Sequence, residues 1–344
     1  MARLRGCGRL GIGALLLVAA AAPCAAQAPA ATLTTVRVST LGGATDAGLY
    51  LADEYGLFRA AGITIDMERF GSTSEQVAAA ATGEVDVAGI AVTAGLFASV
   101  RRGIGLRIVG DKQSIRKGFS STQLMLRTAE FLGSEAETVA SLRGKTFAGP
   151  ARASFGTFLV AEFLKNNGLK FSDIKYVEMP FSSIVTALAN GAIDGATMIE
   201  PFVSAVLRSG AAKPLGDPSA LVPDGASVVP LVYGEAFIAK RALAQAFMNA
   251  YMGGVRLYND AFVKGRDKDK VIAIIARRAK VDPEVIRNGY LAALDPDQRV
   301  NKKLLAAAQD FFAEQGMVQN KADIDALVDP SFAEAAVRAL GEYR

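Results

Sequence analysis

Residues 72–90 read STSEQVAAAATGEVDVAGI, and residues 180–198 read PFSSIVTALANGAIDGATM. Each stretch has a polar start, an Ala-rich helical run, a glycine, one further residue, a β-branched residue and an aspartate, and then a short apolar strand. Gly83 corresponds to Gly191 and Asp86 to Asp194 at one constant offset. A glycine between a helix and a strand is common in α/β proteins. Both copies, however, occupy the same place in their own β–α series, which predicts that one structural unit occurs twice.

The segments around both copies alternate between strand-like and helix-like patterns. In the first half, β-branched alternation predicts strands at 36–41, 63–70, 85–90 and 106–112, with helices at 48–58, 71–83 and 93–103. In the second half, strands are predicted at 122–127, 145–150, 174–179, 193–199 and 212–216, with helices at 154–168, 181–191 and 201–210. This alternation predicts an α/β fold of two lobes, each with a mainly parallel sheet that is covered by helices on both faces.

The last third of the chain changes character. A strand-like return follows the Pro/Gly/Ser-rich stretch that begins at residue 217, and helical patterns then cover 241–262, 268–279, 283–294 and 302–316. No further sheet is predicted there, so we expect this region to pack on lobe one. The predicted organisation is a first part of lobe one at 32–118, lobe two at 119–228, and a return with the helical region at 229–344. The chain would cross between the lobes near 115–124 and 224–236.

The first 26 residues have the three-part pattern of a secretory signal peptide. Arg3, Arg5 and Arg9 precede an apolar run at 11–22, which is too short for a stable membrane span. We expect cleavage after Ala26, because a cut after Ala28 would leave a proline at the new N-terminus. A lipid anchor on Cys24 is disfavoured by the preceding proline. The pattern predicts export to a bacterial periplasm.

Composition excludes several function classes. Loss of the predicted signal takes the formal net charge from +4 to about +1, so no basic stripe remains for nucleic acid. Both cysteines, Cys7 and Cys24, lie in the predicted signal, and the chain has no histidine. Ser-His-Asp and Cys-His catalytic sites and the preferred zinc ligands are therefore absent. We expect no catalytic residues, no metal site and no cofactor.

Candidate ligand-binding residues lie where predicted strands lead into helices, since ligands of open α/β sheets bind beyond the carboxyl ends of the strands. Unpaired N–H groups and the helix dipole favour anions there. The predicted ligand-binding residues are Gly42, Gly43, Ala44, Thr45, Ser72, Thr73, Ala91, Thr93, Arg152, Ser154, Phe155 and Glu200. Met198 is added by the family resemblance given below.

Each of these residues also has an ordinary structural explanation. Ser72 and Ser154 could be plain N-caps, and Ser72 with Glu75 has the capping-box spacing. Arg152 is the strongest candidate for an anion contact, and its alternative is a solvated loop cation. Phe155, like Phe181, could belong to the core, and Glu200 could cap its own helix. The remaining cations near these loops are interpreted as surface charge; they are Arg69, Lys112, Arg116 and Lys117.

Four sequence blocks together resemble one protein family. They are TLGGATDAGLYLADEYGLFRAAGITID, EQVAAAATGEVDVAGI, LRGKTFAGPARASFGTFLVAEFLKNNGL and ALANGAIDGATMIEPF. In this order they resemble the periplasmic substrate-binding proteins of ABC importers of the nitrate/sulfonate/taurine type, and their relatives that bind thiamine-pyrimidine precursors. The resemblance covers roughly residues 35–235. It implies a type II periplasmic-binding-protein fold, two Rossmann-like lobes joined by a hinge, which closes on a small ligand.

The resemblance also implies a function and a partner. The expected function is capture of a small organic solute, with an anion favoured, and its delivery to an inner-membrane ABC permease by a monomer. A ligand-sensing subunit of a membrane receptor is an alternative, and an exported enzyme on the same fold is a weaker one. Some relatives place Trp or His around the ligand, and this chain has neither. The related pyrimidine-forming enzyme needs His and a cysteine-rich motif, so its activity is not expected here.

Overall fold

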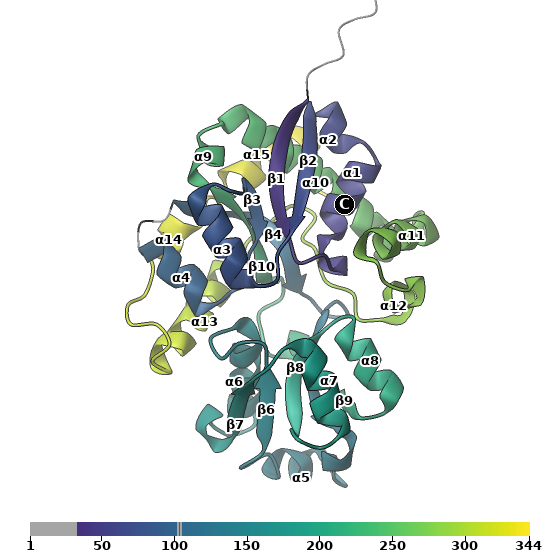
Figure 1. The fold of residues 1–344 in the computed structure, drawn as a ribbon, viewed down its shortest axis with the longest axis vertical. Helices are drawn as coiled ribbons and strands as arrows, with labels where there is room; N and C mark the ends of the chain where they lie inside the picture. Colours follow the sequence, from purple (N-terminus) through teal and green to yellow (C-terminus); the bar gives the residue numbers. More distant parts are fainter. Residues whose placement is uncertain (1–32, 102, 104) are drawn as a thin grey trace, which may run out of the picture. The chain divides into compact units, whose positions relative to one another are not determined.

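The computed structural model describes residues 33–344 apart from 102 and 104, and these residues belong to one structural unit. The predicted signal peptide lies outside the described residues. No helix within the described part has the length and apolar character needed to cross a bilayer. Two five-stranded sheets with helices around them make up this unit (Figure 1). The predicted two-lobed α/β fold is therefore confirmed, and we call the parts built on the first and second sheets lobe one and lobe two.

Lobe one has the strand order β2-β1-β3-β10-β4. Strand β1 is parallel to β2 and β3, while β10 is antiparallel to both of its neighbours. The strands are β1 (Thr34–Thr40), β2 (Ile63–Arg69), β3 (Val87–Gly89), β4 (Leu106–Ile115) and β10 (Ala226–Gly234). The helices before β4 are η1 (Ala44–Asp46), α1 (Ala47–Glu54), α2 (Leu57–Ala60), α3 (Thr73–Thr82) and α4 (Ala94–Arg101).

Lobe two repeats this arrangement with the order β7-β6-β8-β5-β9, in which β5 is the antiparallel strand. Its strands are β5 (Thr122–Arg127), β6 (Thr146–Gly149), β7 (Lys175–Glu178), β8 (Gly195–Ile199) and β9 (Ala212–Pro214). Its helices are η2 (Thr128–Glu130), α5 (Glu135–Ala140), α6 (Phe155–Asn166), η3 (Phe171–Asp173), α7 (Phe181–Ala189), α8 (Phe202–Ser209) and η4 (Pro218–Ala220). The chain thus crosses between the sheets at 116–121 and 215–225, and β10 begins three residues before the return that the sequence places at 229.

The duplicated aspartates make the same contacts in both lobes. The Asp86 carboxylate accepts the Arg37 amide at 2.9 Å, and the Asp86 amide donates to the Arg37 carbonyl at 2.9 Å. Asp194 forms the same pair of bonds with Thr146, both at 2.8 Å. Each aspartate therefore holds the start of its strand, β3 or β8, beside the neighbouring parallel strand. The repeat in the sequence encodes a strand-starting turn, which explains its constant spacing.

The C-terminal region is helical, as predicted, with one exception. Its helices are α9 (Glu235–Ile238), α10 (Arg241–Phe262), α11 (Lys268–Ala279), α12 (Pro283–Asn288), α13 (Lys302–Glu314), α14 (Ile324–Leu327) and α15 (Ser331–Leu340). The helix predicted over 283–294 ends at Asn288, and the segment 289–301 is not helical. This segment lies along β4, where the Ser114 amide donates to the Ala293 carbonyl at 2.8 Å. Residues 292–298 are buried by this contact, and the helix prediction for 289–294 is wrong because tertiary burial overrides local propensity.

The core is continuous between the lobes on one side of the molecule. Helix α10 packs on α1 in lobe one, as expected for the return of the chain. Helix α13 also contacts α6 of lobe two, where the ring of Phe311 lies 5.9 Å from that of Phe158 and 5.7 Å from that of Phe171. The helical region therefore packs on lobe one and also contacts lobe two, and the segment 289–301 and α13 position the site described next.

Candidate functional site

The carboxyl ends of the parallel strands in the two lobes face each other. Strand β4 leaves lobe one at this edge, and β5 enters lobe two at the corresponding edge after the short crossing 116–121 (Figure 1). Two direct contacts join the edges. Thr93 and Ser154 form an isolated antiparallel bridge, flanked by hydrogen bonds of 3.1 Å from the Ala94 amide to the Ala153 carbonyl and 3.0 Å from the Phe155 amide to the Val92 carbonyl.

The second contact between the edges is made by Glu200. Its carboxylate accepts the Ser204 amide at 3.1 Å and the Ser204 hydroxyl at 2.9 Å, which caps α8. It also accepts the Tyr290 amide at 2.9 Å, from the segment 289–301 that packs on lobe one. A Cβ at Gly289 would lie 2.3 Å from the Val285 carbonyl oxygen and 2.9 Å from this carboxylate, so the backbone and the Glu200 side chain both leave no room for a side chain there. Glu200 thus caps its helix, as the alternative interpretation held, and also links the two lobes.

The loop after β1 is held together by the carboxylate of Asp46. Asp46 accepts the amides of Gly42 and Gly43, each at 3.2 Å, and the Thr40 hydroxyl. Its other oxygen lies 2.6 Å from Lys112 Nζ, in an ion pair whose side chains are 5% and 1% exposed. The Gly42 and Gly43 amides, which the sequence offered to an external anion, are therefore satisfied within the loop. Ala44 and Thr45 are half-buried in this loop.

The loops after β2 and β3 carry hydroxyl groups, and side chains there accept backbone amides at the starts of α3 and α4. Ser72 caps α3 by accepting the Glu75 amide at 3.3 Å, while the Glu75 carboxylate accepts the Gly71 amide at 2.8 Å. Thr93 accepts the Leu96 amide at 3.2 Å. Thr73 and Ala91 are half-buried at the same edge.

The loop after β6 is held by contacts within lobe two. The Arg152 guanidinium donates to the Tyr176 carbonyl at 3.2 Å and lies 5.7 Å from the Phe171 ring, so it is held by lobe two. The Ser154 hydroxyl donates to the Ala151 carbonyl at 2.8 Å and does not cap α6. Phe155 is buried, with its ring 5.8 Å from that of Phe158, and Met198 is fully buried in β8. These side chains have structural partners in this structure.

Three further residues at the edges were not among the predicted ligand contacts. Lys112 forms the buried ion pair with Asp46, and Arg69 ends β2 beside Gly42. Tyr290, on the segment that contacts Glu200, is 36% exposed. The sequence identifies Lys112 and Arg69 as cations near the predicted ligand-binding loops. It does not indicate Tyr290 as a site residue, because Tyr290 lies inside a pattern that predicted a helix.

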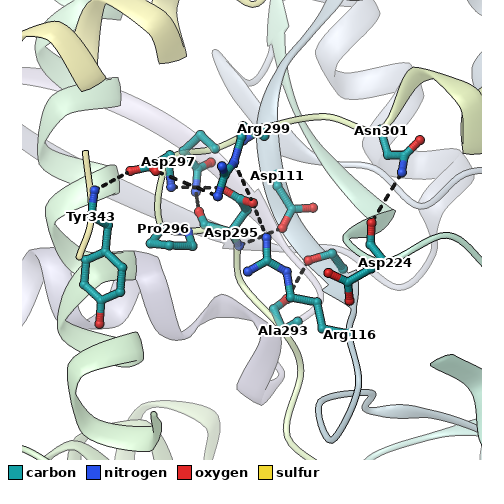
Figure 2. A network of polar contacts seen from close by, with 12 residues as sticks. Asp111, Arg116, Asp224, Ala293, Asp295, Pro296, Asp297, Arg299, Asn301 and Tyr343 are labelled. Carbon is teal, nitrogen blue, oxygen red and sulfur yellow. Dashed lines mark hydrogen bonds and ion pairs between the residues drawn. The ribbon is translucent and has the colours of Figure 1, made fainter. Parts of the chain in front are cut away.

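A polar network joins both crossings to the segment 289–301 (Figure 2). Asp295 pairs with Arg116, the first residue of the first crossing, and with Arg299 at 3.3 Å. Its amide donates to the Asp111 carboxylate at 3.0 Å. Asn301 contacts the carbonyl of Asp224, in the second crossing, at 3.5 Å.

Asp111 is the buried acid of this network. Burial raises the pKa of Asp111 to about 7, and the neighbouring Asp295 charge raises it too, while the Asp295 amide lowers it. The Asp111 side chain is fully buried in this structure. Within the described ranges, no cluster of three or more Asp, Glu, His or Cys residues could hold a metal ion.

Comparisons with known proteins agree with this architecture. A family model described as NMT1/THI5 like matches residues 44–258. No curated protein matches the chain by sequence.

Several solved structures have the same fold at low sequence identity. The periplasmic aliphatic sulphonate binding protein SsuA from Escherichia coli is 21% identical, with a TM-score of 0.68 over 86% of this chain and 92% of that chain. The periplasmic nitrate-binding protein NrtA from Synechocystis PCC 6803 is 14% identical, with a TM-score of 0.69 over 90% and 89%. The desulfurization enzyme DSZB is 17% identical, with a TM-score of 0.60 over 89% and 99%. At these identities the likeness concerns the fold.

Proposed function

Because the chain belongs to the NMT1/THI5-like family, we propose that it is the solute-binding protein of an ABC importer. In this proposal it captures a small organic solute between the facing carboxyl edges of its two sheets, in the periplasm, and delivers the solute to a membrane permease. The observation that carries the proposal is the pair of facing edges, joined by two crossings and by the contacts Thr93–Ser154 and Glu200–Tyr290. Ligands of open α/β sheets bind at such edges, and two linked lobes can close around them.

The fold neighbours support this choice over catalysis. Two of them are described as periplasmic binding proteins, for sulphonate and for nitrate, whereas one, DSZB, is described as an enzyme. The chain has no histidine, and its two cysteines lie in the predicted signal peptide. A catalytic site would have to use Asp, Glu, Lys, Tyr or Ser alone, and Asp111, the carboxylate whose pKa is raised, is inaccessible. We therefore infer binding without turnover.

The test is a thermal-shift screen of the purified protein against sulfonates, carboxylates, nitrate and pyrimidines, with small-angle scattering of each positive. A ligand at 100 times its Kd should add about 2.7 kcal/mol to the free energy of unfolding. This corresponds to a rise of a few degrees in Tm for a chain of this size. We expect one chemical class to raise Tm, to be recovered unchanged, and to reduce the radius of gyration.

Two outcomes would contradict the proposal. Conversion of the bound compound would indicate an enzyme on this fold, as DSZB is described to be. The absence of any bound solute, both in the screen and in native mass spectra of protein incubated with a periplasmic extract, would remove the binding function itself. A bound solute that stimulates no permease ATPase in reconstituted membranes would favour the ligand-sensing alternative.

A further inference from the structure

We infer that Arg69 is the residue that selects an anionic group on the solute, and that the solute is an organic anion with an apolar body. The inference rests on the proposed function, because it concerns the same site. It assigns to Arg69 the role that the sequence suggested for Arg152.

Arg69 stands at the carboxyl edge of lobe one with its guanidinium exposed. It is the last residue of β2 and pairs with Thr40, the last residue of β1. Its side chain lies over Gly42, where an added Cβ would be 2.9 Å from Nε and 3.0 Å from Cζ. Gly42 also has φ of +77°, so a side chain is disfavoured there for two reasons. The loop after β1 thus leaves space in which the guanidinium rests.

The Arg69 guanidinium makes no hydrogen bond or ion pair with any residue in the described part of the chain. A planar guanidinium without a partner can bind a carboxylate or sulfonate through two parallel hydrogen bonds. Ser72, the N-cap of α3, and Thr73, the first residue of α3, follow Arg69 closely in sequence at the same strand end, and both are half-buried. Their hydroxyls would supply further donors for an anion.

Other cations at the two edges are already bound within the protein. Lys112 is buried against Asp46, and Arg116 is paired with Asp295. Arg152 donates to the Tyr176 carbonyl. Lys117 is exposed in the crossing 116–121 and is not among the predicted ligand-binding residues, which makes it the control for loss of one positive charge.

Apolar and aromatic side chains are exposed or half-buried at the facing edges of both lobes. Leu41 directly follows β1 and is 42% exposed, and Tyr290 is 36% exposed. On lobe two, Phe181 and Phe202 begin α7 and α8, and their half-buried rings stack with centroids 5.6 Å apart. Exposed or half-buried aromatic and aliphatic groups at a ligand site favour an apolar ligand surface. A fully hydrated inorganic anion would make no apolar contact with these side chains.

The experiment compares benzenesulfonate and benzoate with their neutral amides, and with nitrate, by calorimetric titration of the purified protein. We expect an arene anion to bind at least 10-fold more tightly than its amide and than nitrate, with a Kd that rises with KCl concentration. Arg69→Ala should raise this Kd at least 10-fold, and Arg69→Lys should raise it less. Lys117→Ala should change it less than 3-fold.

Each contrary outcome overturns the inference in a recognisable way. If Arg152→Ala weakens binding of the arene anion and Arg69→Ala does not, then Arg152 is the residue that binds the anionic group. If the amides or nitrate bind as tightly as the arene anions, the assigned ligand class is wrong while the solute-binding function stands. If no panel member binds at 10 mM, the assigned class is also wrong. The native mass spectra described above then decide separately whether the protein binds any solute.

Discussion

Asp111 shows how one buried group can set the pH dependence of this protein. Its ordinary pKa of 3.8 applies in the unfolded chain, and burial raises the pKa to about 7 in the folded chain. The folded state therefore holds one more proton between about pH 4 and pH 7. The stabilisation that this proton provides is complete below pH 3.8 and is lost as the pH rises through 7.

We predict that Asp111→Asn removes this pH dependence. In the native protein the free energy of unfolding should fall by on the order of 3 kcal/mol between pH 4 and pH 7 from this group. The chain has no histidine, so few other groups titrate at pH 5–7. Urea unfolding at a series of pH values measures the slope. An equal slope in the Asn variant would show that Asp111 is not the group responsible.

Glu200 is the residue that joins the lobes by a side-chain hydrogen bond to the backbone of the segment 289–301. We predict that Glu200→Ala lowers the free energy of unfolding by about 1–3 kcal/mol, because the Tyr290 and Ser204 amides lose their acceptor. Glu200→Gln keeps one acceptor oxygen and should restore part of the loss. Amide hydrogen exchange should show faster exchange at Tyr290 in the Ala variant.

Ser204→Ala is the matched control for this link. It removes only the hydroxyl bond within lobe two, so the Tyr290 amide should stay protected. Loss of protection at Tyr290 in both variants would mean that helix capping, and not the link between lobes, governs this segment.

At the scale of elements, the close packing of α10 on α1 depends on the glycine at position 254. An added Cβ at Gly254 would lie 2.2 Å from the Gly48 carbonyl oxygen and 2.7 Å from the Ala52 amide nitrogen. These are backbone atoms of α1 and cannot move aside without shifting the helix. The neighbouring Gly253 would meet only a Leu57 methyl at 2.8 Å, at the end of a flexible side chain.

We predict opposite effects for the two glycines. Gly254→Ala should lower the free energy of unfolding by about 1–3 kcal/mol, because overpacking outweighs the gain of about 1 kcal/mol in helix propensity. Gly253→Ala should be neutral or stabilising by up to about 1 kcal/mol, since it gains propensity without a backbone clash. Thermal or urea unfolding measures both. Equal effects of the two substitutions on the free energy of unfolding would show that the close approach of α10 to α1 does not determine the cost of an added methyl group.

At the scale of the whole molecule, the two lobes share part of one core. Phe311 on α13 contacts Phe158 and Phe171 of lobe two, whereas its neighbour Phe312 lies 6.2 Å from Phe97 of lobe one. We predict that the native protein unfolds in one calorimetric transition. Phe311→Ala should cost about 3–5 kcal/mol and separate the lobes into two transitions.

Phe312→Ala is the control for this prediction. It removes a ring of the same size from a fully buried position, and should lower the Tm without splitting the transition. Two transitions already in the native protein would show that the lobes unfold independently despite this shared core. Equal splitting in both variants would show that general destabilisation, and not the contact between lobes, decides cooperativity.

The sequence by itself determined the order of strands and helices, the duplication and the family resemblance. These depend on periodicity and turn residues among near neighbours, as with Asp86 and Asp194. The tertiary structure decided which side chains remain available at the strand ends. The Asp46 carboxylate pairs with Lys112, distant in sequence, and accepts the Gly42 and Gly43 amides that seemed open to an anion. The helix predicted over 283–294 ends at Asn288 because burial on β4 outweighs local propensity. Partners of this kind arise only when distant segments pack, so spacing along the chain cannot identify them.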